Sequence, residues 1–279
     1  MPTLKQLPKP RLCHECKFVA ACHFRVGRFN LDKLPLKGEL VGFYFDNLLP
    51  EADAIRCRQH SRFHTRAQDA FDLLEAIGRD CVGAVQLLPE GQTPKNVFSI
   101  EAETLDDEAL ERLLRAAVSS ALPGQAIEAD DFRISLAGAQ EKTALPWHEG
   151  RWCRPLGATP TTHVFKFPLG LVVHRQADLR TSVENEWLCT QILTAYGVPV
   201  APCEIRHFGE QKALVVERFG RKLHSSTGWW LRLPQEDFCQ VSGHRLDRTR
   251  QLTQAQMTST EDAANRRANR FRQLGVETR

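Results

Sequence analysis

The sequence has none of the features of a membrane-spanning or secreted protein. No apolar run reaches the roughly 18 residues that a membrane helix needs, and the N-terminus, Met1 to Lys5, lacks the apolar segment of a secretory signal. The nine cysteines are scattered and odd in number, which argues against a secreted disulfide framework. From these absences we expect a cytoplasmic protein with no membrane segment.

The sequence also lacks an even distribution of charge. The net charge of +3 divides into +5 over residues 1–30, +4 over residues 241–279 and −6 over the residues between them. The basic ends are either arms that bind nucleic acid or segments that do not belong to the same folded unit as the acidic middle. Residues 261–274 could form a surface helix, but such a helix would have little apolar face to bury. Its arginines could bind nucleic acid, although a solvated basic face is the commoner meaning of such a run; they are Arg266, Arg267, Arg270 and Arg272.

A cysteine–histidine cluster near the N-terminus offers enough ligands for zinc. Cys13, Cys16, Cys22 and His23, with His14 beside them, could supply a tetrahedral site. The spacing between Cys16 and Cys22 is unusual for zinc, and no apolar pattern surrounds it. We therefore favour unpaired thiols in a loose segment over a metal site.

Periodicity predicts regular structure from residue 34 onwards. Residues 71–78 are predicted to form a short helix that ends at Gly78, and residues 82–89 a buried strand. Thr104 and Asp107 have capping-box spacing at the start of a further helix. That helix carries one apolar face: Ala109, Leu110, Leu113, Leu114, Ala117 and Val118.

The second half of the chain alternates strand and helix patterns, which predicts an α+β fold. Strands are expected at residues 132–135, 142–145 and 163–167, and a hairpin is expected from residues 203–208 and 212–218. A helix over residues 182–196 places four apolar residues near one face: Val183, Trp187, Ile192 and Ala195.

Lys166 and Glu186 have the spacing of a lysine–glutamate pair at a nucleotide site. Lys166 lies in a predicted strand and Glu186 in the helix that follows, so their side chains can meet. In protein kinases a strand lysine binds the phosphates and a helix glutamate holds that lysine. Such residues are common, however, and an exposed Lys166 with a solvated Glu186 is the more frequent meaning of this spacing.

Residues 135–143 join two strand-like segments and are mostly small at their start. Small residues let a backbone approach a phosphate group closely. The segment contains only Gly138 as glycine, so it is neither a G-x-G-x-x-G loop nor a Walker motif. Taken alone, it fits a plain hairpin loop better than a phosphate-binding loop.

Residues 131–145, Asp-Phe-Arg-Ile-Ser-Leu-Ala-Gly-Ala-Gln-Glu-Lys-Thr-Ala-Leu, resemble the signature loop of the HipA family of serine/threonine protein kinase toxins. Further stretches resemble the family in the same order: residues 45–50, 71–83, 159–166, 182–186, 216–219 and 232–240. The resemblance covers roughly 200 residues of the chain. It implies a small N-terminal subdomain followed by a kinase-like N-terminal lobe that lacks most of the helical C-terminal lobe.

The resemblance implies a role for each matching residue. The phosphates of ATP would be covered by Ala137, Gly138, Ala139, Gln140, Glu141 and Lys142, and contacted by Lys166 with Glu186 as its partner. Glu217, Arg218 and Phe219 would line the adenine. Ser135 would be the autophosphorylated serine, and a phosphate there would push the loop out of its ATP-bound form.

The resemblance also implies cofactors and partners. ATP and Mg2+ would serve the chemistry, and a cytosolic protein such as glutamyl-tRNA synthetase would be the substrate. A HipB-like helix-turn-helix antitoxin would neutralise the protein and make most of the contact with operator DNA.

The sequence departs from the family after Gln240. Family members continue into a D-G-x-x-K-N catalytic loop and a later metal-binding aspartate, and neither is found here; Asp247 and Asp262 lack that context. We therefore assign no catalytic and no metal-binding residue, and expect no useful phosphoryl transfer from this chain alone. Our hypothesis is that one or both ends are read from a shifted frame or a disrupted gene.

These observations predict four segments and leave two functions open. The segments are a divergent basic one (1–30), a HipA-like N-terminal subdomain (31–122, ending near Pro123 and Gly124), a kinase-like ATP-binding lobe (123–240) and a basic, poorly ordered tail (241–279). Without a helical lobe, apolar surface should be exposed, including at Trp229 and Trp230. The chain is a HipA-type kinase toxin by descent or, alternatively, a noncatalytic regulatory or interaction fragment that binds an antitoxin or a separate kinase chain.

Overall fold

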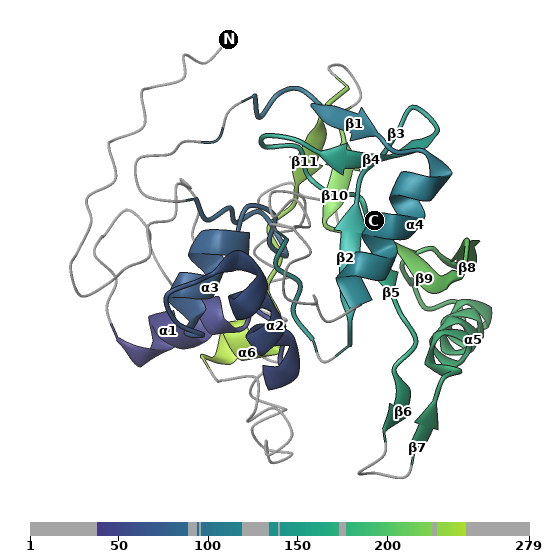
Figure 1. Cartoon of the computed structure of the whole chain (residues 1–279), viewed down its shortest axis with the longest axis horizontal. Coiled ribbons are helices and arrows are strands. Elements are labelled where there is room, and N and C mark those ends of the chain that lie inside the picture. The colour runs from purple at the N-terminus through teal and green to yellow at the C-terminus, as the bar shows by residue number, and fades with distance from the viewer. Residues whose placement is uncertain are drawn as a thin grey trace.

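The computed structural model of the chain describes residues 38–88, 94, 96–118, 134–138, 140–172, 177–224 and 228–243 (Figure 1). The N-terminal cysteine–histidine cluster and the arginines of residues 266–272 lie outside these residues, as does the possible surface helix over residues 261–274. The described part combines helices with antiparallel sheets, which confirms the predicted α+β class. None of its helices is long and apolar enough to span a bilayer.

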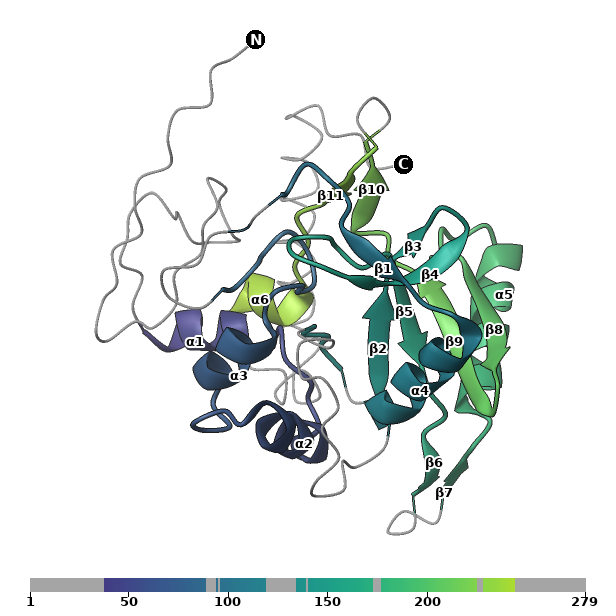
Figure 2. The same cartoon turned by 45° about the horizontal axis from the view of Figure 1, so that its top comes forward.

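Four short helices form a unit on one side of the molecule (Figures 1 and 2). They are α1 (Glu39–Asp46), α2 (Asp53–Phe63), α3 (Ala70–Ile77) and α6 (Phe238–Ser242). The buried side chains of Leu49, Leu73 and Ile77 belong to its core. Helix α6 lies beside α1 although about two hundred residues separate them, and Gln240 Nε2 donates a hydrogen bond to the Tyr44 carbonyl at 3.1 Å.

The predicted helix at residues 71–78 is confirmed, and the strand predicted at residues 82–89 is wrong. Asp69 caps α3, because its side chain accepts a hydrogen bond from Asp72 N at 3.0 Å. Beyond α3 the chain turns at Gly83, whose φ is +75° and where a Cβ would lie 2.8 Å from Gln235 O. Residues 85–88 have no regular structure, although Val85 and Leu87 are buried in the core of the helical unit. Burial therefore explains their apolar pattern without any strand pairing.

A four-stranded antiparallel sheet forms the centre of the second unit. Its strand order is β2 (Lys142–Leu145), β5 (His163–Lys166), β9 (Gln211–Glu217) and β8 (Cys203–Phe208). The strand at residues 163–167 and the hairpin of β8 and β9 were predicted and are confirmed. Phe165 and Leu214 of the two central strands are fully buried.

Helix α4 (Asp107–Val118) covers one face of this sheet together with a second, smaller sheet (Figure 2). The smaller sheet has the order β1 (Ala102–Thr104), β4 (Arg151–Pro155) and β3 (Trp147–His148). Leu110 and Leu114 of α4 share a core with Phe165, which confirms the apolar face predicted for this helix. The predicted cap is wrong: Thr104 ends β1, and Asp106 Oδ1 accepts the hydrogen bond from Ala109 N at 2.7 Å.

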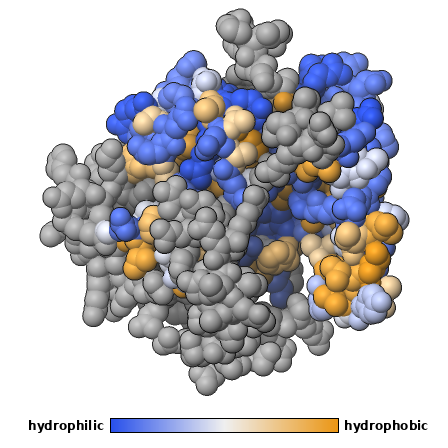
Figure 3. Space-filling model, turned by 90° about the horizontal axis from the view of Figure 1, so that it is seen from below, coloured by the Kyte–Doolittle hydropathy of each residue, from blue (hydrophilic) through white to orange (hydrophobic). Residues whose placement is uncertain are grey.

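Helix α5 (Ser182–Ala195) lies against β8 and β9 with little of its surface covered. Only Val183 of its described side chains is buried, so the predicted common face of Val183, Trp187 and Ile192 is wrong. Apolar side chains point outward along the helix instead. Figure 3 shows apolar surface gathered on the side of the molecule where α5 lies, next to the hairpin of β6 (Gly170–Val172) and β7 (Ala177–Leu179).

A hairpin of β10 (Arg221–Leu223) and β11 (Trp230–Arg232) leads from the sheet back to α6. Trp229 and Trp230, which were expected to be exposed, are only partly so. Trp229 stacks on His224 with ring centroids 5.4 Å apart and meets Phe98 edge-on at 5.1 Å. At this hairpin the exposed large apolar residue is Leu223 of β10 rather than either tryptophan, whereas α5 carries several exposed apolar residues.

Candidate functional site

The structure brings Lys166 and Glu186 together. Lys166 ends β5, an inner strand, and Glu186 lies in the second turn of α5. Lys166 Nζ donates a hydrogen bond to Glu186 Oε1, and both side chains are partly exposed. Because β5 pairs on both sides, with β2 and with β9, the backbone of Lys166 is fixed and its ammonium group is held at the end of the sheet.

A second lysine lies beside this pair. Lys142 of β2 is directly opposite Lys166 in the strand register, and Lys142 Nζ donates a hydrogen bond to the Ala137 carbonyl. Burial, together with the neighbouring charge of Lys166, lowers the pKa of Lys142 to about 8, while Glu51 and Glu186 act in the opposite direction. The ammonium groups of Lys142 and Lys166 therefore lie close together at one end of the sheet. They are next to residues 135–142, which we call the 135–142 loop.

The start of the 135–142 loop is attached to the helical unit. Ser135 is completely buried; its Oγ donates to Leu48 O at 2.6 Å and its amide donates to Asp80 O at 3.3 Å. Gly138 forms a bridge with Pro50, and its carbonyl accepts from Glu51 N at 3.1 Å. Gly138 has a φ of +117°, which is costly for any residue with a side chain.

The end of the 135–142 loop is tied to both units. Gln140 Nε2 donates to Phe167 O at 2.5 Å, and Phe167 N donates to Glu141 O at 3.2 Å. Glu141 also forms an ion pair with Arg58 of α2. Ala139 lies outside the described residues.

The three residues expected at the adenine lie where β9 ends, and their side chains diverge. Glu217 is exposed, and Phe219 is 71% exposed. Arg218 is buried and points away from solvent, with Nη1 2.9 Å from Asp80 Oδ2. The Arg218 side chain is therefore part of the interior, and only its backbone shares the strand end with Glu217 and Phe219.

Sequence reasoning missed a buried ionic cluster around Asp80. This carboxylate is within 3.1 Å of guanidinium nitrogens from Arg218, Arg221 and Arg232, and accepts a 2.6 Å hydrogen bond from Thr161 Oγ1. Burial alone would raise the pKa of Asp80, but the three guanidiniums hold it well below its usual range. An arginine-rich segment after β9 was the available signal, but nothing in the sequence pairs Asp80 with residues about 140 positions away.

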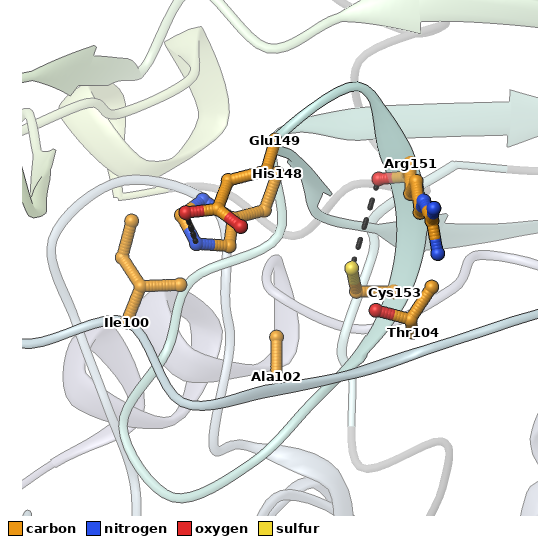
Figure 4. A pocket seen from close by; sticks show the side chains of 7 residues that line it. All are labelled: Ile100, Ala102, Thr104, His148, Glu149, Arg151 and Cys153. Carbon is orange, nitrogen blue, oxygen red and sulfur yellow. Dashed lines mark hydrogen bonds and ion pairs between the residues drawn. The ribbon is translucent and has the colours of Figure 1, made fainter.

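A cavity lies away from the 135–142 loop. It has a volume of about 370 Å3, lies between β1 and the β3–β4 turn, and is lined by residues that include His148, Glu149, Arg151 and Cys153 (Figure 4). Burial raises the pKa of the Cys153 thiol, which donates to Arg151 O at 3.6 Å, so this thiol is not a poised nucleophile. No residue of the 135–142 loop lines this cavity.

The described residues include no cluster of metal-ligating side chains. Among them, no group of three or more histidine, cysteine, aspartate or glutamate side chains could hold a metal ion.

A lysine at the end of an inner strand, paired with a glutamate of the next helix and close to the 135–142 loop, is the arrangement expected in the N-terminal lobe of a kinase-like protein. Family models agree with this class: a HipA-like C-terminal domain matches residues 134–276, and a HipA N-terminal domain matches residues 27–88. The chain belongs to the HipA family. The first match continues past Gln240, where the resemblance in individual motifs ends.

Relatives and solved structures point to the same family. The putative kinase Y4mE of Sinorhizobium fredii is 36% identical over 205 residues, covering 72% of this chain and 46% of that protein. The serine/threonine-protein kinase toxin HipA of Shewanella oneidensis is 27% identical, covering 77% and 47%. In a solved complex of Shewanella oneidensis HipA, HipB and operator DNA, a matching chain has a TM-score of 0.56 and 26% identity, covering 75% of this chain and 46% of its own length. This chain thus spans about half the length of the relatives it matches.

Proposed function

We propose that this chain binds ATP through Lys166, Glu186 and the 135–142 loop, as the nucleotide-binding part of a HipA-type serine/threonine kinase toxin. The observation that carries this proposal is the Lys166–Glu186 ion pair, held on an inner strand directly beside Lys142. A paired lysine is fixed in place, so it can meet a phosphate without a further loss of side-chain freedom.

The proposed nucleotide has a distinct partner at each end. Lys166 would contact the phosphates, and backbone groups of the 135–142 loop, including Gly138, would cover them. At the other end, backbone groups of residues 217–219 would read the adenine edge, and the exposed ring of Phe219 offers a face on which it can stack. Mg2+ would be held by the phosphates and by groups beyond the described residues.

Ser135 is proposed as the autophosphorylation site, and its present position limits when it can react. Its hydroxyl is completely buried and is engaged by the Leu48 carbonyl. Transfer of a phosphoryl group to Ser135 would therefore require the start of the loop to leave the helical unit. We expect no turnover from this chain by itself.

The partners follow from the family and stay proposals for this chain. The solved relative is a complex with HipB and operator DNA, so we propose a HipB-like antitoxin as a partner, with operator DNA bound mainly through that antitoxin. A cytosolic protein such as glutamyl-tRNA synthetase is the proposed substrate of the complete kinase, and the cytoplasm its proposed location.

The decisive experiment measures nucleotide binding and phosphorylation with the full 279-residue chain. Calorimetric titration with Mg-ATP should show binding that a Lys166→Ala variant weakens about tenfold or more, because a charge-assisted contact is lost. Lys222→Ala, on an exposed part of β10, is the control. Intact mass after incubation with Mg-ATP should be unchanged.

Either of two results would change this proposal. Undetectable binding by the folded wild-type chain would contradict the nucleotide site. A phosphate on Ser135 that is absent from Lys166→Ala would contradict the expected inactivity, and would show that the chain carries its own catalytic groups.

A second function is favoured by the apolar surface of α5. Leu188 and Ile192 are 52% and 47% exposed, on the side of the helix turned away from the sheet. Such a face favours a noncatalytic module that binds an antitoxin or a separate kinase chain. A stable complex with such a partner, together with no ATP binding, would support this alternative over the first.

A further inference from the structure

Lys142 differs from Lys166 and Lys212, two other lysines of the central sheet, in the group that its ammonium contacts. Lys166 pairs with Glu186 and Lys212 pairs with Glu184, so each ammonium meets a carboxylate. Lys142 Nζ instead donates to the Ala137 carbonyl of the loop above it. A Cβ at Gly138 would lie only 2.6 Å from Lys142 Nζ, so the ammonium occupies the space that the missing side chain leaves.

The 135–142 loop is consequently held from two sides. On one side the helical unit fixes Ser135 through Leu48 O and fixes Gly138 through Glu51 N. On the other side Lys142 ties the Ala137 carbonyl to β2. Loss of the ammonium proton would remove a positive charge and weaken this tie at the same position, because a neutral amine is a much poorer donor.

We propose that Lys142 is a positioning residue that couples nucleotide binding to protonation: the 135–142 loop accepts phosphate in its ordered form only while Lys142 is an ammonium ion. The inference rests on the proposed ATP site and adds the residue that controls it. An ammonium group has three donors, so the contact with Ala137 leaves capacity for a phosphate oxygen.

The surroundings of Lys142 set the pH range. Burial and Lys166 of β5 lower the pKa of Lys142 to about 8, whereas Glu51 of the α1–α2 connection and Glu186 of α5 oppose this. The adjacent Glu141 is paired with Arg58. A bound phosphate adds negative charge and raises the pKa of Lys142, so binding takes up a proton whenever the free protein has lost it. Affinity is therefore nearly full at pH 7, falls by about half at pH 8 and decreases further as the pH rises.

The test titrates the full chain with the magnesium complex of a non-hydrolysable ATP analogue at pH 7 and pH 9. Each titration is repeated in two buffers of different ionisation enthalpy, which gives the protons taken up. We expect affinity to be about tenfold weaker at pH 9, with uptake of about 0.9 proton per nucleotide at pH 9 and about 0.1 at pH 7.

Three variants separate charge from structure. Lys142→Arg stays charged at both pH values, so its affinity should not fall at pH 9 and its proton uptake should vanish. Lys142→Met should bind weakly at both pH values with no uptake. Lys212→Met, which removes a lysine of neighbouring strand β9 that is paired with Glu184, should behave like the wild type. Thermal unfolding checks each variant, and Lys142→Arg carries the test if Lys142→Met does not fold.

The outcomes distinguish this inference from the function on which it rests. Nucleotide binding with the same proton uptake in wild type and Lys142→Arg would overturn the role of Lys142 and leave the ATP site intact. Binding that does not change between pH 7 and pH 9 would do the same. No binding by the wild type at either pH would overturn both.

Discussion

Asp80 links parts of the chain that lie far apart in the sequence. Its carboxylate meets Arg218 at the end of β9, Arg221 of β10 and Arg232 of β11, while its carbonyl accepts the amide of Ser135. One residue thereby joins the helical unit to the start of the 135–142 loop and to the strand proposed to read adenine. The three arginine side chains are almost completely buried, so each depends on this carboxylate for its charge balance.

Removal of the Asp80 charge should destabilise the fold strongly. We expect Asp80→Asn to lower the free energy of unfolding by about 3–5 kcal/mol, because it leaves buried guanidiniums without a counter-charge. Urea unfolding at pH 7 measures the change. The pKa of Asp80 is lowered in the folded state, so its contribution is complete above the unfolded pKa and is lost as the pH falls through the folded pKa. Asp178→Asn, which breaks an exposed pair with Arg180, is the control and should change little.

At the scale of elements, helix α4 connects the smaller sheet to the central one. It begins directly after β1 and packs against β2, β8 and β9, so its start determines how its leucines meet the sheet. Leu105 N donates to Trp152 O at 2.9 Å, which fixes the residue before the cap. The cap residue Asp106 therefore follows a residue whose backbone is held by the smaller sheet, and its side chain binds the first turn of α4.

Loss of this cap should cost a measurable part of the stability. Asp106→Ala should lower the free energy of unfolding by about 1 kcal/mol, because the Ala109 amide loses its acceptor. Asp106→Asn keeps an acceptor in place and should lie close to the wild type. Equal stability of Asp106→Ala and wild type in chemical denaturation would show that the carboxylate is not the cap in solution.

At the scale of the whole molecule, α5 exposes apolar side chains to water, which is energetically unfavourable. A helix that is apolar on the side facing the sheet and on the side facing away from it is normally covered on both. Exposed apolar residues lie along the helix and continue past its end: Trp187, Leu188, Ile192, Leu193, Tyr196 and Val198. Such a surface favours association, either with a partner or between copies of the chain.

Polar replacement on α5 should reduce self-association without loss of stability. We expect the double variant Leu188→Gln/Ile192→Gln to scatter less light at high concentration and to keep its melting temperature, because both side chains are already half exposed. Leu156→Gln is the matched control, since Leu156 is 46% exposed but lies outside α5. If the wild type, the double variant and Leu156→Gln self-associate equally, the apolar surface of α5 is not responsible for the association.

The sequence by itself determined the elements whose signals are local. The helix ending at Gly78, the apolar face of α4 and the hairpin of β8 and β9 follow from spacing and turn residues within a few positions of one another. The proximity of Lys166 and Glu186 was also suggested by their spacing, because Glu186 lies in the first helix after the strand of Lys166, with only the β6–β7 hairpin between them.

Only the tertiary structure decided the contacts between distant segments. Pairing of Asp80 with three arginines, the place of Lys142 under the Ala137 carbonyl, and the burial of Arg218 and Ser135 depend on how the helical unit meets the sheet. The outward apolar side of α5 and the irregular chain at residues 85–88 were likewise missed, because apolar residues have the same pattern whether they pair as a strand, fill a core or face a partner. Local spacing fixes which elements form, and long-range packing decides which of their side chains are buried, charged or free to bind.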